Sequence, residues 1–138
     1  MRALLDTDVI LDLLLDRAGF ADSAAELWEA NEQGRMDAYI SAITPVNVFY
    51  IARKLKGAET ARQAVGELLS TLRVCALNQA DLQTAMLLGM NDFEDAVQVA
   101  CAMANQIDVI ITRNLTDYKN APLPAFSPPD FLARLASG

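Results

Sequence analysis

Aspartates placed beside apolar segments are the residues of this sequence best suited to chemistry. One group interrupts ALLDTDVILDLLL (residues 3–15), a second opens NDFEDAVQVACAMANQ (residues 91–106), and a third follows DVIIT (residues 108–112). The acids concerned are Asp6, Asp8, Asp12, Asp92, Asp95 and Asp117. Carboxylates that lie close together repel each other and raise one another's pKa values. A cluster of them in apolar surroundings therefore needs a compensating cation.

The 138-residue chain contains no histidine, which excludes Ser–His–Asp and Cys–His catalysis and the usual zinc sites. Carboxylates without His or Cys suit Mg²⁺ or Mn²⁺, because these hard cations prefer oxygen ligands. Such an ion polarises a phosphate group and turns bound water into a nucleophile. The net charge of −7 is the opposite of the usual nucleic-acid-binding footprint. Acids gathered around a metal ion would account for part of that charge.

Most of these acids also have a purely structural explanation. Asp6 can cap a helix, a common use of aspartate. Asp92 and Asp95 suit the positive end of a helix dipole. Asn114 and Asp117 are common in turns. Each group taken alone is therefore more typical of local structure than of catalysis.

Three other acids, Asp12, Asp16 and Glu94, are expected to be exposed. Asp8, Asp12 and Asp16 are spaced by four residues, so they can lie on one helix face. We expect Asp12 and Asp16 to lie on the surface despite their mutual repulsion. Glu94 is expected to be an exposed residue in the first turn of its helix.

Short apolar runs alternate with amphipathic segments along the chain. Strands are predicted at residues 3–6, 37–42, 73–77, 108–112 and 125–126. Helices are predicted at residues 7–15, 21–31, 44–57, 57–72, 79–89, 91–106 and 127–136. Thr44, Asn78 and Ser127 are the predicted N-caps of three of these helices, and Gly57 is a predicted helix end.

This alternation favours an α/β fold. We predict one domain over residues 1–138, with three α/β/α layers and a central parallel sheet of four to five strands covered by helices on both faces. Ligands of such sheets bind beyond the carboxyl ends of the strands. The side chains expected to meet at that edge are Asp6, Asn47, Asp92, Asp95, Thr112, Asn114 and Asp117.

Four segments in this order resemble the PIN-domain ribonucleases. They are LLDTDVILDLL, YISAITPVNVFYIARK, DFEDAVQVACAMANQIDVIITRNLTDY and FSPPDFL. The resemblance covers roughly residues 1–132 and is nearest to a bacterial branch that carries Asn in place of Glu in the second motif. It implies a metal-dependent endoribonuclease that hydrolyses RNA phosphodiester bonds. Many members of the family are toxins of type II toxin–antitoxin pairs.

The resemblance also implies roles for single residues. Asp6 matches the first acid of the family, Asp95 the third, and Asp117 the acid of the TRNxxDY motif. Thr112 and Asn114 match the polar residues beside that acid. The metal ligands implied for Mg²⁺ or Mn²⁺ are Asp6, Asp95 and Asp117, with Asp92 close by.

Asn47 is the main departure from the family pattern, because the second acid is usually Glu at this position. A neutral amide removes one anionic ligand, so metal affinity should fall unless Asp92 or Asp8 compensates. Asp8 stands where the family more often has Asn, and it is a candidate for the outer shell of the site.

Two other functions fit parts of the sequence. A catalytically weak or inactive PIN-like module that binds RNA or protein is compatible with Asn47. A haloacid-dehalogenase-like phosphatase would use Asp6 as nucleophile and Asp8 as general acid. That chemistry also needs a lysine and a later acid pair after a strand, whereas Lys54 and Lys56 lie in mid-helix and NDFED follows a helix. A receiver-like module would need a phosphoacceptor Asp after the third strand and a Lys after the last long strand, and RVCALNQAD and VIITRN supply neither cleanly.

The expected partners are an RNA substrate, an antitoxin protein and a second copy of the chain. Arg113 and Lys119 flank the predicted site and are the basic residues best placed to hold RNA. Phe49 and Tyr50 suit an apolar surface for a homodimer or an antitoxin, or they belong to the core.

The chain is expected to be cytoplasmic. Cys75 and Cys101 lie in apolar segments without metal-ligand spacing, so we predict reduced, buried thiols. No apolar run is long enough to span a membrane, so no membrane partner is expected.

Overall fold

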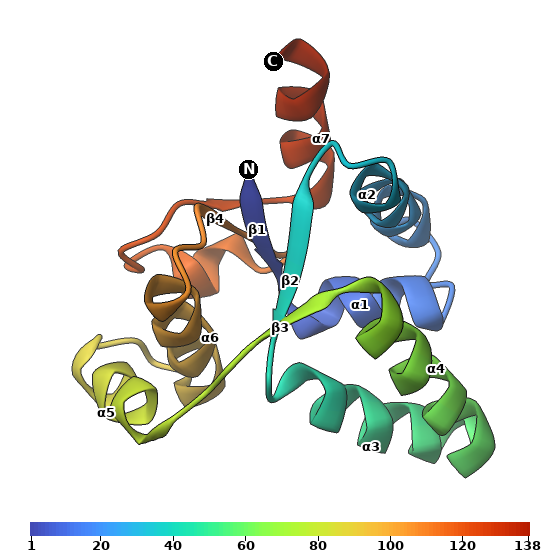
Figure 1. Ribbon diagram of the computed structural model, residues 1–138, viewed down its shortest axis with the longest axis horizontal. Helices are drawn as coiled ribbons and strands as arrows, with labels where there is room; N and C mark the ends of the chain where they lie inside the picture. The colour runs from blue at the N-terminus through green and yellow to red at the C-terminus, as the bar shows by residue number, and fades with distance from the viewer.

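Five parallel strands form the centre of the computed structural model, which describes residues 1–138 (Figure 1). The strands are β1 (Arg2–Leu5), β2 (Asp37–Ser41), β3 (Arg73–Cys75), β4 (Val109–Ile111) and β5 (Ala125–Phe126). Their order in the sheet is β3-β2-β1-β4-β5, and every neighbouring pair is parallel. The predicted α/β class and parallel sheet are confirmed.

Seven α-helices and one short 3₁₀ helix connect the strands. They are α1 (Thr7–Leu14), α2 (Ala21–Glu32), α3 (Thr44–Lys56), α4 (Ala58–Thr71), α5 (Gln79–Leu87), α6 (Phe93–Ala104), η1 (Leu115–Tyr118) and α7 (Pro128–Ser137). Asn78 and Ser127 cap α5 and α7 through their side chains, as predicted.

The prediction that Thr44 caps α3 is wrong. Ile43 occupies the N-cap position, and Thr44 is the first helical residue. The Thr44 hydroxyl is buried and contacts the hydroxyls of Thr7 and Ser41, at 3.2 and 3.4 Å. This side chain is thus used for packing between elements and not for capping.

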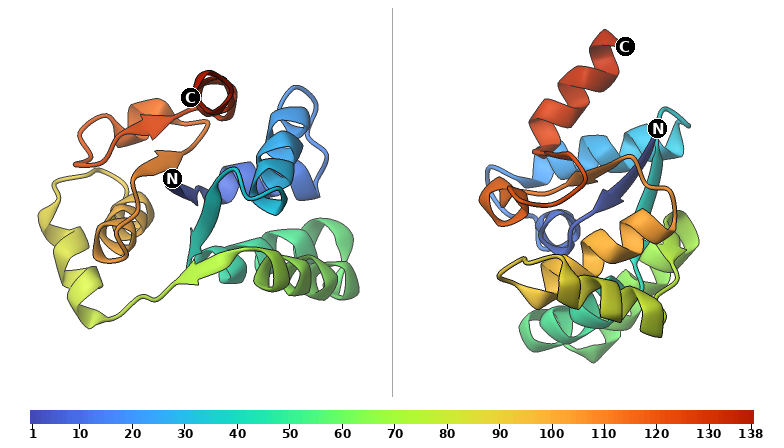
Figure 2. Two further views of the ribbon diagram at one scale, coloured as in Figure 1. Left: turned by 45° about the horizontal axis from the view of Figure 1, so that its top comes forward. Right: turned by 90° about the vertical axis from the view of Figure 1, so that its left-hand side faces the viewer.

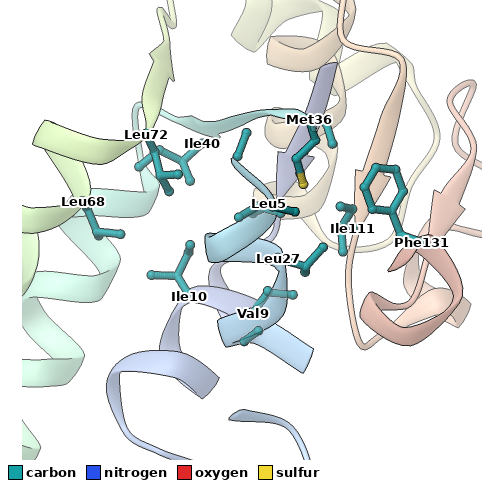
Figure 3. Packing of buried hydrophobic residues seen from close by; sticks show 14 of the residues in the cluster. Leu5, Val9, Ile10, Leu27, Met36, Ile40, Leu68, Leu72, Ile111 and Phe131 are labelled. Carbon is teal, nitrogen blue, oxygen red and sulfur yellow. The ribbon is translucent and has the colours of Figure 1, made fainter. Parts of the chain in front are cut away.

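Helices cover both faces of the sheet (Figures 1 and 2). Side chains alternate along β1, so Leu5 faces one layer and Leu4 the other. Leu5 joins the larger core with side chains of α1, α2, α4 and α7, such as Ile10 and Phe131 (Figure 3). Leu4 packs against Cys101 of α6 on the opposite face. Burying one side chain of the Leu or Phe type contributes about 1.5–3 kcal/mol, so both layers hold the strands in register.

The structure also tests the predictions for the two cysteines and for membrane-spanning segments. Cys75 and Cys101 are buried free thiols, which confirms the prediction for these residues. No helix combines the length and the apolar character that crossing a membrane requires.

The carboxyl ends of the central strands are in register. Leu5 of β1 pairs with Ile111 of β4, and the Asp6 N–H donates to the Ile111 carbonyl at 2.9 Å. One strand further, the Thr112 N–H donates to the Phe126 carbonyl at 3.0 Å. The residues that follow β1, β4 and β5 therefore emerge side by side at one edge.

Candidate functional site

Asp6 is the centre of a hydrogen-bond network at this edge. It is 6% exposed, and its Oδ1 accepts hydrogen bonds from the Thr7 N–H at 2.7 Å and from Gln98 Nε2 at 2.8 Å. Its Oδ2 accepts from Thr112 Oγ1 at 2.8 Å and from the Tyr118 hydroxyl at 3.2 Å. A carboxylate offers about four acceptor positions, so Asp6 is saturated when the Tyr118 hydroxyl donates to it together with the other three groups. Asp6 is consequently fixed in orientation, at the N-cap of α1.

The Tyr118 hydroxyl joins Asp6 to Asp95. It lies 3.2 Å from Asp6 Oδ2 and 3.1 Å from Asp95 Oδ1, and it accepts a hydrogen bond from Gln98 Nε2 at 3.2 Å. A phenol carries one proton, so it donates to one carboxylate at a time. Burial and the two carboxylates raise the pKa of Tyr118, so the phenol stays protonated.

The surroundings of Asp95 destabilise its charged form. Burial, followed by the charges of Asp6 and Asp92, raises the pKa of Asp95 to about 7. The Tyr118 hydrogen bond opposes this rise, and the charge of Asp117 adds to it weakly. Near neutral pH the carboxyl group is therefore close to half-protonated, and a cation beside it would favour the charged form.

Asn47 contacts Glu94, an acid that was predicted to be exposed and was not assigned to the site. Its Nδ2 donates to Glu94 Oε1 at 2.8 Å. Glu94 is exposed as a whole residue, as predicted. Partial desolvation of its carboxyl group and the charges of Asp6 and Asp92 nevertheless raise its pKa. Glu94 therefore belongs to the acidic cluster, on the side where Asn47 lies.

Asp92 and Asp117 lie further out. Asp92 is the N-cap of α6 and accepts a hydrogen bond from the Asp95 N–H at 3.0 Å. Asp92 and Asp117 both line a polar pocket of about 150 Å³, together with Asn91 and Asn120. No hydrogen bond or ion pair engages the Asp117 side chain.

Asp8 forms a second centre beside Asp6. Its Oδ2 accepts from Asn114 Nδ2 at 2.9 Å and from the Arg113 N–H at 3.3 Å, while its buried Oδ1 has no partner. Burial and the charge of Asp6 raise the pKa of Asp8 to about 7. Thr112 thus orients Asp6, whereas Asn114 orients Asp8.

The prediction that Asp12 lies on the surface is wrong. Asp12 is 1% exposed, and its Oδ2 lies 2.7 Å from Nε of Arg113. This N–H is not aimed at the carboxylate, so the contact is an ion pair and not a hydrogen bond. Arg17 Nη1 lies 3.5 Å from Oδ1. Asp12 is buried because its helix face turns toward the loop after β4, where Arg113 supplies the opposite charge.

Three residues at this edge were not among the predicted site residues: Gln98, Tyr118 and Glu94. Gln98 is fully buried, and its Oε1 has no partner. A signal for Gln98 was present, because it is the one amide inside the apolar run AVQVACA. Tyr118 follows Asp117 directly, but nothing local indicates that its hydroxyl turns inward.

The side chains at this edge fit a divalent cation in donor type and in charge. The donors are oxygen atoms of carboxylates, amides and hydroxyls, which Mg²⁺ and Mn²⁺ prefer. Desolvation by burial, followed by repulsion from Asp6 and Asp92, raises the pKa values of Asp95 and Glu94, and a cation beside these groups would favour their charged forms. The acids are not arranged as a ready-made cage, since no three of them together form a metal-binding group.

Comparison with known proteins points to one family. The model of the PIN domain family matches residues 2–116. A toxin–antitoxin complex from Klebsiella pneumoniae contains a chain that is 26% identical, with a TM-score of 0.69 over 91% of this chain and 97% of that one. No curated protein matches the sequence.

Two more distant structures share the fold. VapBC2 from Rickettsia felis, bound to a DNA fragment from its promoter, gives a TM-score of 0.74 at 18% identity, over 92% of this chain and 98% of that one. VapC20 from Mycobacterium tuberculosis, described as a sarcin–ricin loop cleaving toxin, gives 0.65 at 18% identity, over 96% and 94% of the two chains.

Proposed function

This chain belongs to the PIN-domain family, and from that premise we propose that it is a metal-dependent endoribonuclease that hydrolyses RNA phosphodiester bonds. The observation that carries the proposal is the Asp6–Tyr118–Asp95 bridge at the carboxyl edge of the sheet. It holds two carboxylates beside each other where α/β folds bind their ligands. VapC20, described as a sarcin–ricin loop cleaving toxin, lends support through the shared fold.

Asp6 and Asp95 are the proposed main ligands of the cation, with Asp92 and Asp117 beside them. A bound Mg²⁺ or Mn²⁺ would polarise the scissile phosphate and lower the pKa of a water molecule. Thr112 and Gln98 hold the Asp6 carboxylate in place, so it needs little reorganisation. Asn114 does the same for Asp8.

Glu94 is proposed to supply the carboxylate that Asn47 lacks. The two side chains are hydrogen-bonded at 2.8 Å, so the charge sits within reach of the position that the family usually fills with Glu. Asn47 then acts by orienting Glu94. This assignment takes the place of compensation by Asp92 or Asp8.

We further propose that the chain is the toxin of a type II toxin–antitoxin pair, acting in the cytoplasm. The Klebsiella pneumoniae complex supports an antitoxin partner. An apolar hollow on α3 and α4, lined by Val46, Phe49, Tyr50 and Val65, is a suitable docking surface for an antitoxin or for a homodimer. Tyr50 is 61% exposed there.

One alternative has an observation in its favour. Because no three acids form a ready-made metal group, and Asn47 replaces an acid, a PIN-like module that binds RNA or protein without cleaving it also fits. Membership of the PIN-domain family leaves the phosphatase hypothesis without support.

Cleavage of labelled single-stranded RNA in Mn²⁺, Mg²⁺ or EDTA tests the proposal. The wild type should cleave with either metal and not in EDTA, and Asp95→Asn should be inactive. Asp22→Asn, an exposed acid in the first turn of α2, is the matched control and should retain full activity. Absence of cleavage on several RNAs would favour the binding module instead.

A further inference from the structure

We propose that a pocket beside the candidate metal site receives one unpaired base of the RNA strand, an inference that rests on the proposed ribonuclease function. The pocket measures about 210 Å³ and lies between the start of α2, the start of α7 and the loop after β4. Its lining consists of Asp12, Gly19, Phe20, Ser23, Arg113, Ser127, Pro128 and Pro129.

Arg113 connects this pocket to the site. Its backbone N–H donates to Asp8, and the residue before it, Thr112, donates to Asp6. The residue that lines the pocket with its guanidinium therefore contacts the candidate metal site with its own backbone, and its neighbour in sequence contacts Asp6. An RNA strand whose phosphate lies at Asp6 and Asp95 would bring a neighbouring nucleotide to the pocket.

The guanidinium of Arg113 is held ready for a planar ligand. Its Nε lies 2.7 Å from the buried Asp12, and its Cζ lies 4.1 Å from the centre of the Phe20 ring. Its two Nη groups make no hydrogen bond within the chain. Unpaired RNA bases bind by stacking on aromatic rings and guanidinium planes and by hydrogen bonds at their edges. Because Arg113 is already fixed, little side-chain freedom is lost on binding.

The lining favours a base over a phosphate group. Phe20, Pro128 and Pro129 offer mainly carbon surface. The N-terminus of α7 offers no free N–H near the pocket, since the two prolines have none and Asp130 N–H is bonded to Ser127 Oγ at 3.2 Å. Asp12 would also repel an anion. A base presents apolar faces to such walls, and its edge can meet the Nη donors and the serine hydroxyls.

Scanning a single abasic nucleotide along a short single-stranded RNA tests this pocket. Binding would be followed by fluorescence anisotropy in EDTA, where the base pocket keeps all its groups. For the wild type, one abasic position near the cleavage point should weaken binding about tenfold, the size of one lost stacking contact. Ser23→Phe, which fills the pocket, should bind the intact RNA about tenfold more weakly and should show no further loss at that position.

Two more variants keep the test decisive. Ser137→Phe makes the same change at the exposed end of α7 and should behave like the wild type. Phe20 is 44% exposed, so Phe20→Ala should fold normally, and it should reduce the abasic effect. If Ser23→Phe and Phe20→Ala showed the same abasic profile as the wild type, the proposal that this pocket receives an RNA base would be overturned. Binding of a protein partner at the pocket would not rescue it. Failure of the wild type to cleave the same RNA in Mn²⁺ would instead overturn the proposed function.

Discussion

The side-chain amide of Asn47 donates a 2.8 Å hydrogen bond to the carboxylate of Glu94, a residue on a different helix. The position that usually carries an acid in the family pattern is therefore neutral, while a carboxylate lies directly against it. In the proposed site, Glu94 on α6 would supply the negative charge that Asn47 on α3 lacks.

The first prediction concerns removal of the Glu94 carboxylate and its replacement by a carboxylate at position 47. Glu94→Gln should weaken Mn²⁺ binding and reduce kcat/KM by about 10- to 100-fold, as for loss of a group supporting a metal site. Adding Asn47→Glu to this variant should restore both, because the new carboxylate reaches the same space. Calorimetry of Mn²⁺ binding and RNA cleavage rates provide the two readouts. Glu59→Gln, in the first turn of α4, is the control, and a double variant as weak as Glu94→Gln would contradict the assignment.

Tyr118→Phe should bind Mn²⁺ several-fold more tightly than the wild type. Four donor groups lie within hydrogen-bond distance of the Asp6 carboxylate, and the Tyr118 hydroxyl makes the longest of these contacts, at 3.2 Å. A cation at Asp6 must displace one donor, so removing the hydroxyl removes a competitor. Titration calorimetry measures the change, with Tyr50→Phe on the exposed face of α3 as the control. Equal binding by Tyr118→Phe would contradict this competition, and weaker binding would show that the hydroxyl supports the cation.

Stability without metal should fall as the pH rises. The folded-state pKa of Asp95 is raised from 3.8 to about 7, so between these values the folded protein binds more protons than the unfolded chain. The free energy of unfolding therefore decreases with rising pH across this window. In EDTA, Asp95→Asn should be more stable than the wild type at pH 7.5 by about 1 kcal/mol, after allowance for screening of a partly exposed group.

Urea unfolding of both proteins at pH 5 and pH 7.5 measures this effect. The difference between them should shrink at pH 5, where Asp95 is mostly protonated. Some pH dependence should remain in Asp95→Asn, because the pKa of Asp8 is raised to about 7 as well. Loss of stability in Asp95→Asn at pH 7.5 would contradict this prediction, because it would mean that the surrounding groups stabilise the charged Asp95 carboxylate.

Asp12→Asn should destabilise the fold by about 2–3 kcal/mol. Removing one partner of a buried ion pair leaves the other charge uncompensated, at a cost of about 3–5 kcal/mol when both are fully buried. Here Arg113 is partly exposed, which lowers that cost. Thermal and urea unfolding provide the measurement. Asp16→Asn on the exposed end of the same segment should change stability by less than about 0.5 kcal/mol.

The sequence by itself determined the elements and the edge at which the site lies. Alternating apolar runs and amphipathic segments encode strands and helices locally, and the side chains of Asn78 and Ser127 mark helix starts through bonds to residues three positions away. Since parallel strands end at one edge, the position of Asp6 directly after β1 was enough to predict the edge at which the candidate site lies.

Only the tertiary structure decided which side chains touch. Glu94 meets Asn47 across 47 positions of sequence, and the Tyr118 hydroxyl reaches Asp6 across 112. Asp12 shows the same limit, because its spacing indicated a helix face but not which neighbour covers that face. Such contacts depend on how helices pack against the sheet and on side-chain rotamers, and neither is encoded in the local periodicity of the chain.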